Sequence, residues 1–212
     1  MSEPGVTLTD YLLALECGAF AVWLQRGSPD PRTLRPAFTL FFAAASLAAL
    51  LGGSVHGFFP AADSIGFRLL WPATLLSIGL GATAGWLVGG RLVFSAEAAR
   101  RVALIAWLLL ALYATAVLGG AWEFRVAIAA YLPATLFMLL GFTLEWRRRR
   151  ARAALCGVLG MLLTFAAAAV QQLGIAAHPV YFDHNALYHL IQAFAFLYVF
   201  RAAGGLCGNE DR

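Results

Sequence analysis

Long apolar runs alternate with short polar breaks along almost the whole chain. Seven of these runs approach the roughly 20 apolar residues that a helix needs to cross a hydrocarbon core. The breaks between them are short and carry prolines, glycines and charges. The pattern predicts helices at about 9–25, 36–58, 66–89, 102–120, 125–145, 153–173 and 184–201. Because the connections are short, consecutive helices are expected to pack side by side as antiparallel hairpins.

The composition agrees with this pattern. The 212-residue chain is 61% hydrophobic and 12% charged, and its mean hydropathy is +0.77. Soluble domains are about half apolar and about a quarter charged. We therefore expect an all-α polytopic membrane protein whose residues 1–212 form one seven-helix domain. The start of the chain has no basic segment followed by a cleavage site, so the first apolar run is expected to remain as a helix.

The arginines predict how the helices are oriented. They concentrate in the first, third and fifth connections and at the end of the chain, whereas only Arg68 and Arg125 fall on the opposite side. The positive-inside rule then places those connections and the C-terminus in the cytoplasm, and the N-terminus outside. The arginines concerned are Arg26, Arg32, Arg35, Arg91, Arg100, Arg101, Arg147, Arg148, Arg149, Arg150, Arg152, Arg201 and Arg212. This placement explains the net charge of +4 without a nucleic-acid partner. Abundant alanine and an absence of lysine suggest a bacterial inner-membrane protein.

A cluster of polar residues opens the last apolar run, from Asp183 to Gln192. Within it, Asn185, His189 and Gln192 are spaced i, i+4 and i+7, so they share one face of a helix. Histidines, an acid and amides are costly where a helix enters lipid, so this cluster predicts a functional site. In the expected orientation His56, near the end of the second run, lies on the same outer side of the membrane.

These histidines suggest a zinc site, because catalytic zinc takes three protein ligands and a water molecule. His56 and His189 would provide two ligands if the second and seventh helices are neighbours. Candidates for the third are His184, Asp183, Asp63 and Asn185, with His184 preferred. His184 and His189 are i, i+5 and lie on different helix faces, so His184 would have to fold back from the entry turn. The alternative is that these are hydrogen-bonded histidines at the membrane interface.

The sequence allows more than one role for several carboxyl and hydroxyl groups. Asp183 is expected to be the N-cap of the last helix, with or without a role in the site. Asp63 either caps the third helix or accepts a proton from a metal-bound water. Ser54, two residues before His56, is a further catalytic candidate. Glu16 lies inside the first run and is expected to face the bundle interior beside a polar partner, for helix packing or proton handling.

This arrangement resembles the CREST superfamily of seven-helix membrane proteins, which includes alkaline ceramidases and the progestin and adiponectin receptors. The family pattern is a Ser and a His on helix two, an Asp near helix three, and His-x-x-x-His on helix seven. His56 and His189 match the helix-two His and the second helix-seven His, and Asp63 is a candidate for the Asp. Asn185 stands where the first helix-seven His is expected, and Gly52 replaces the serine four residues before His56.

The resemblance implies a zinc-dependent hydrolase of a lipid amide or ester near the outer leaflet. His56, His184 and His189 would hold the zinc, and Asp63 and Ser54 would assist catalysis. A second interpretation is a receptor or binding protein that holds a lipid or small ligand without turnover. Its pocket would use the same polar residues, among them Glu16, Asp183, Asn185 and Gln192. A third is a small-solute or proton-coupled transporter.

Overall fold

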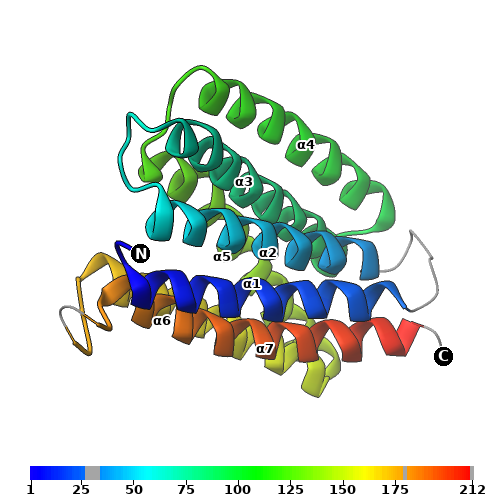
Figure 1. The fold of residues 1–212 in the computed structure, drawn as a ribbon. Helices are drawn as coiled ribbons and strands as arrows, with labels where there is room; N and C mark the ends of the chain where they lie inside the picture. The colour runs from blue at the N-terminus through cyan, green and yellow to red at the C-terminus, as the bar shows by residue number, and fades with distance from the viewer. Residues whose placement is uncertain (27–33, 179–180, 211–212) are drawn as a thin grey trace.

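The computed structural model describes residues 1–26, 34–178 and 181–210, and within them the chain is all α. Its seven helices, each long and apolar enough to cross a membrane, confirm the predicted seven-helix membrane protein. The helices are α1 (Pro4–Gln25), α2 (Arg35–Phe58), α3 (Ile65–Val93), α4 (Ala96–Leu118), α5 (Phe124–Arg149), α6 (Arg152–Gln172) and α7 (His184–Glu210) (Figure 1). Arg32 and Arg212, which entered the orientation argument, lie outside the described residues.

Several helices extend beyond their apolar runs into the charged ends. The clearest cases are α4, which begins at Ala96 rather than near 102, and α7, which continues to Glu210 rather than ending near 201. At the start of α4, the Ser95 side chain accepts a hydrogen bond from the backbone N–H of Ala98. A capped helix can start in the polar headgroup region, whereas hydropathy detects only the part within the hydrocarbon.

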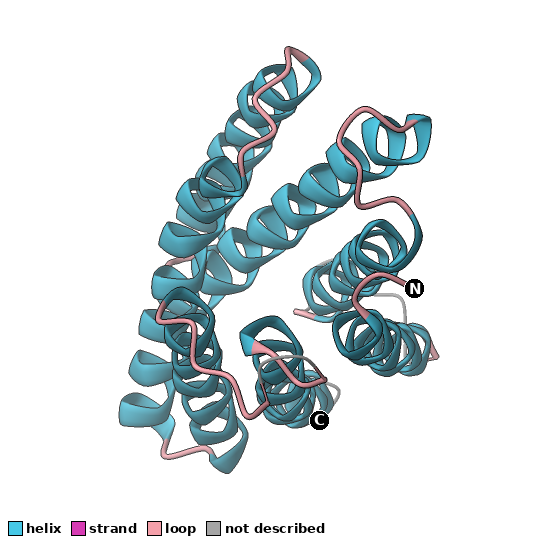
Figure 2. Ribbon diagram, turned by 60° about the vertical axis from the view of Figure 1, so that its left-hand side comes forward, coloured by secondary structure: helices cyan, strands magenta, loops and turns pink. Residues whose placement is uncertain are grey.

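Six of the helices form a closed ring. In order around it, α1 contacts α2, α2 contacts α3, α3 contacts α5, α5 contacts α6, α6 contacts α7, and α7 contacts α1. In the part of the chain that the structure describes, α4 lies outside this ring and packs on α3 (Figures 1 and 2). The ring surrounds the central cavity described below. Helix α1 lies between α2 and α7, and α2 and α7 touch each other only slightly.

The expected hairpin between α4 and α5 does not form, because α3 is the principal partner of both helices. Two sets of small residues on α3 account for this. Gly79 faces the ring of Tyr113 on α4, whose hydroxyl donates a hydrogen bond to the backbone oxygen of Leu75, 2.9 Å away. Gly85 faces Ala134 of α5, where an added Cβ would already be in van der Waals contact at 3.5 Å. Small residues on two faces allow α3 to be approached closely from both sides.

Candidate functional site

The ring of helices encloses a cavity of about 410 Å³. It is lined by residues from α1, α2, α3, α5, α6 and α7. On α7 the lining runs from Asn185 to Phe196, a rise of roughly 16 Å at about 1.5 Å per residue. Most lining side chains are apolar, such as Leu13, Phe41 and Ile128. The polar lining residues include Asp10, His56, Gln171, Asn185, His189 and Gln192.

The most buried ionisable pair in the cavity joins α1 to α7. The Nε2 atom of His189 lies 3.2 Å from Oδ1 of Asp10, and their side chains are 13% and 5% exposed. On the other side of the imidazole, Nδ1 lies 3.4 Å from the hydroxyl oxygen of Thr9. That hydroxyl donates to the backbone carbonyls of Gly5 and Val6 at 2.9 and 3.0 Å, so its lone pairs remain to accept from the ring. Both nitrogens of His189 are therefore held by α1.

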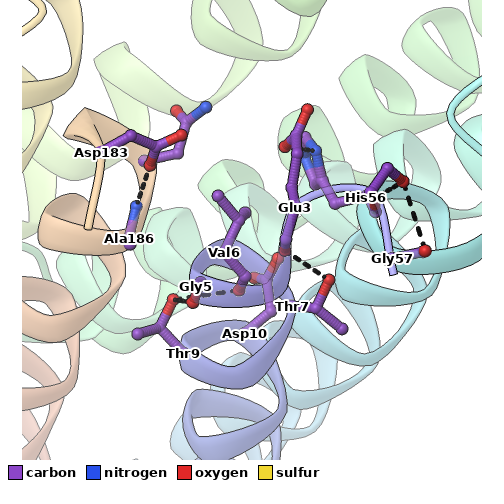
Figure 3. Close-up of polar contacts among 12 residues, drawn as sticks. Glu3, Gly5, Val6, Thr7, Thr9, Asp10, His56, Gly57, Asp183 and Ala186 are labelled. Atoms are coloured by element: carbon purple, nitrogen blue, oxygen red, sulfur yellow. Dashed lines mark hydrogen bonds and ion pairs between the residues drawn. The ribbon is translucent and has the colours of Figure 1, made fainter. Parts of the chain in front are cut away.

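A second carboxylate–imidazole pair joins α1 to α2. Oε2 of Glu3 lies 2.8 Å from Nδ1 of His56, and these side chains are 43% and 30% exposed. Ser2 reinforces the contact, because its hydroxyl donates to the backbone oxygen of His56 at 2.8 Å. Figure 3 shows Glu3, at the start of α1, beside His56 near the end of α2. Glu3 and Asp10 are seven residues apart, so two turns of α1 provide one carboxylate for each histidine.

Two amide side chains complete the polar part of the cavity. Asn185 accepts a hydrogen bond from Nε2 of Gln171 at 3.1 Å, which ties α7 to α6. Nε2 of Gln192 donates to the hydroxyl of Thr164 at 3.0 Å. The carbonyl oxygen of Gln192 is buried, and among the described residues it has no hydrogen-bond partner. Because Gln192 lines the cavity and is only 2% exposed, this oxygen is an unused acceptor buried in the cavity wall.

Four of the residues singled out from the sequence line the cavity together: His56, Asn185, His189 and Gln192. Asp183 acts as the predicted helix cap, since its carboxylate accepts from the backbone N–H of Ala186 at 2.9 Å (Figure 3). His184 is the first residue of α7 and is not a lining residue.

The other predicted residues lie away from the cavity. Asp63 is exposed, and the predicted cap of α3 is instead Ser64, whose hydroxyl accepts from the N–H of Phe67 at 3.1 Å. The hydroxyl of Ser54 donates to the backbone oxygen of Leu50 at 2.8 Å. Glu16 is half-buried, and among the described residues its Oε2 has no hydrogen-bond partner, so the expected polar neighbour is not found for this atom.

Asp10 and Glu3 are not among the residues predicted from the sequence. Asp10 lies within the apolar run assigned to the first helix, so the energetic reasoning applied to Glu16 applied equally to it. Glu3 precedes that run, and only its seven-residue separation from Asp10 connected the two. The partners of both histidines, Glu3 and Asp10, come from the start of the chain, far in sequence from His56 and His189.

Residues 6–207 match the family described as "Family of unknown function (DUF6962)". The chain belongs to this family. The matched region includes part or all of each of the seven helices and every cavity-lining residue. No curated protein matches the chain, and no solved structure does.

The zinc hypothesis requires three ligands, and this DUF6962 chain supplies two candidate histidines at the cavity. Across residues 1–26, 34–178 and 181–210, no group of three or more His, Cys, Asp and Glu side chains is arranged to hold a metal ion. His56 and His189 each have a carboxylate partner instead. The described residues therefore do not fit a three-ligand zinc centre, and we derive no chemical step through a metal.

Proposed function

We propose that this DUF6962 member binds an amphipathic lipid or a similar small ligand in its central cavity and does not turn it over. The observation that carries the proposal is the composition of the cavity wall: a mostly apolar chamber of about 410 Å³ whose polar residues include Asp10, His189 and Gln192. Ligand pockets typically measure about 300–1,000 Å³, are mostly apolar, and use a few polar groups to fix orientation. The apolar wall suits a hydrocarbon chain.

The unused oxygen of Gln192 restricts the chemistry of the ligand. An unpartnered buried acceptor costs about 1–3 kcal/mol, and a bound donor would remove this cost. A matching ligand therefore carries a hydroxyl or an N–H group. Gln192 is three residues beyond His189 on the same helix, a rise of roughly 4.5 Å. The donor would lie about one turn deeper than the Asp10–His189 pair.

Long-chain alcohols test this proposal. We expect purified protein to bind 1-dodecanol more tightly than its methyl ether, because the ether oxygen cannot donate to Gln192. Replacing Gln192 with leucine should weaken alcohol binding by roughly 2–12-fold, the equivalent of one hydrogen bond worth about 0.5–1.5 kcal/mol, and leave ether binding unchanged. Trp71 lines the cavity, so tryptophan fluorescence can follow the titration.

Thr135→Val is the matched control, because Thr135 also lines the cavity but already donates to the backbone oxygen of Tyr131 at 2.9 Å. It should preserve the preference for the alcohol. Failure of the wild type to bind either compound would contradict the function. Binding without discrimination would contradict only the role assigned to Gln192.

A second candidate function is hydrolysis of a lipid amide or ester, as the CREST resemblance implies. The observation in its favour is that His56, Asn185 and His189, which occupy family-pattern positions, all line one cavity. Metal content separates the two candidates. The binding proposal predicts no stoichiometric zinc in protein purified without chelator. About one zinc per chain, lost in His189→Ala, would overturn it in favour of the hydrolase.

The proposed orientation has the arginine-rich ends of the helices in the cytoplasm. Arg91 near the end of α3 and Arg152 at the start of α6 both belong to that side. The residues Asp10, His56 and His189 lie toward the other ends of their helices. With the bacterial inner membrane proposed as the location, a ligand would enter the cavity from the outer leaflet.

A further inference from the structure

A second cavity, of about 1,020 Å³, lies at the arginine-rich end of the molecule. Arginines from three helices line it: Arg91 from α3, Arg100 from α4, and Arg148 and Arg149 from α5. The two cavities have no lining residue in common. Apolar side chains such as Leu87, Leu92 and Ala103 form much of the remaining wall.

The arrangement of α4 explains why this space exists. Within the described residues α4 packs on α3 rather than on α5, and Figure 1 shows it on the outer side of α3. The first turns of α4 and the last turns of α5 therefore face a common opening beside the end of α3. α5 ends in Arg147–Arg149, and α4 begins after the capping residue Ser95.

The lining residues carry a strong positive charge. Among the described lining residues, the four arginines share the cavity with one carboxylate, that of Glu145. Oε1 of Glu145 lies 3.0 Å from Nε of Arg149, so Glu145 offsets one of these positive charges. The N-terminus of α4 adds the positive end of a helix dipole beside Ser95. An anion placed there would reduce the repulsion among the guanidinium groups.

We propose that this cavity binds the anionic headgroup of a membrane phospholipid. Guanidinium groups from different helices can hold one phosphate through charge-assisted, two-pronged hydrogen bonds. The apolar wall formed by residues such as Leu87 and Ala103 accommodates the start of an acyl chain. Basic pockets between membrane helices at the headgroup level are suited to anionic lipids.

The four arginines around this cavity do more than set the orientation of the helices in the membrane, because they converge on one space. Arginines that only orient the helices need not gather around one space, and several at the same end do not. Arg101 is 2.5 Å from Glu97 on its own helix. The guanidinium carbon of Arg150 lies 5.3 Å from the centre of the Trp146 ring. Neither arginine lines the cavity, and neither does Arg147.

These outer arginines give a matched control for the test. Full-length protein, stripped of lipid in a neutral detergent, is titrated with phosphatidylglycerol in mixed micelles, and bound lipid is counted by native mass spectrometry. Arg100→Gln/Arg148→Gln removes two cavity arginines, whereas Arg101→Gln/Arg147→Gln removes the same charge from the same end. We expect binding weaker by roughly 100-fold or more in the first variant, from the loss of two charge-assisted contacts. We expect less than about 3-fold in the control, where only exposed charge is lost.

Equal losses in the two variants would overturn the proposal, because they would show attraction by overall charge alone. Phosphatidylcholine at the same concentrations should bind more weakly than phosphatidylglycerol, since its headgroup has no net charge. Inorganic phosphate is the remaining probe. If millimolar inorganic phosphate displaced phosphatidylglycerol and bound with the same affinity, the cavity would be assigned to a free anion. That result would overturn the lipid assignment. Arg100→Lys/Arg148→Lys should retain more binding than the glutamine pair, which separates loss of contact from misfolding.

Discussion

Replacing Gly160 with alanine is expected to weaken the contact between α6 and α7 and to lower the stability of the whole bundle. A Cβ at this position would lie 2.8 Å from the backbone oxygen of Ala195 and 3.1 Å from the backbone nitrogen of Val199. Backbone atoms in a packed helix cannot rotate away as a side chain can, so the two helices must move apart. Overpacking of this kind costs about 1–3 kcal/mol, and sometimes more. For a chain of this size the thermal midpoint falls by about 2–4 °C for each kcal/mol.

Thermal unfolding in one detergent, followed by circular dichroism, measures this effect. Gly204→Ala is the matched control on α7, because a Cβ there meets only the ring of Trp23, at 3.9 Å. That substitution should leave the midpoint unchanged or raise it slightly. Equal midpoints for Gly160→Ala and wild type would contradict the close packing of α6 on α7, and with it the position of Gln192 and Thr164.

The number and approximate positions of the helices could be predicted from the sequence because hydropathy is a local property. Each run of apolar residues reports its own burial in lipid, whatever its neighbours are. The partner of each helix depends on two surfaces at once. Gly79 and Gly85 were visible as small residues, but nothing local identified Tyr113 and Ala134 as the groups that would meet them. The packing of both α4 and α5 on α3 therefore could not be predicted from the sequence.

The candidate site was predicted in part for a similar reason. Asn185, His189 and Gln192 were found because helical spacing places them on one face. His184 is rotated away from that face by the same geometry, and it does not reach the cavity. Asp63, predicted as a helix cap or a proton acceptor and as a candidate for the family's Asp, lies exposed in the turn before α3. The carboxylate that contacts His189 comes from a helix far away in sequence, so only the fold reveals Asp10 as its partner.

Asp10→Ala is expected to destabilise the protein by about 1–3 kcal/mol, because it would leave the buried imidazole of His189 without its hydrogen-bond partner. The pair joins α1 to α7, and the two side chains are only 5% and 13% exposed. The loss should be largest when one partner is missing. In Asp10→Ala/His189→Ala neither group remains to be left unpaired, so the double variant should lose less than the sum of the single variants. Denaturation of all four proteins in one detergent gives the coupling free energy between Asp10 and His189.

The Glu3–His56 pair provides an internal comparison, since it has the same two chemical groups at a shorter distance of 2.8 Å but is 43% and 30% exposed. Solvent screens exposed pairs, so the coupling in the corresponding Glu3→Ala/His56→Ala cycle should be below about 1 kcal/mol. A larger coupling for the exposed pair than for the buried one would contradict the assignment of Asp10–His189 as the contact that fixes α1 against α7. The same substitution at Asp10 should also weaken 1-dodecanol binding, because Asp10 and His189 both line the cavity. Glu3 is not a lining residue, so Glu3→Ala should leave that binding largely intact.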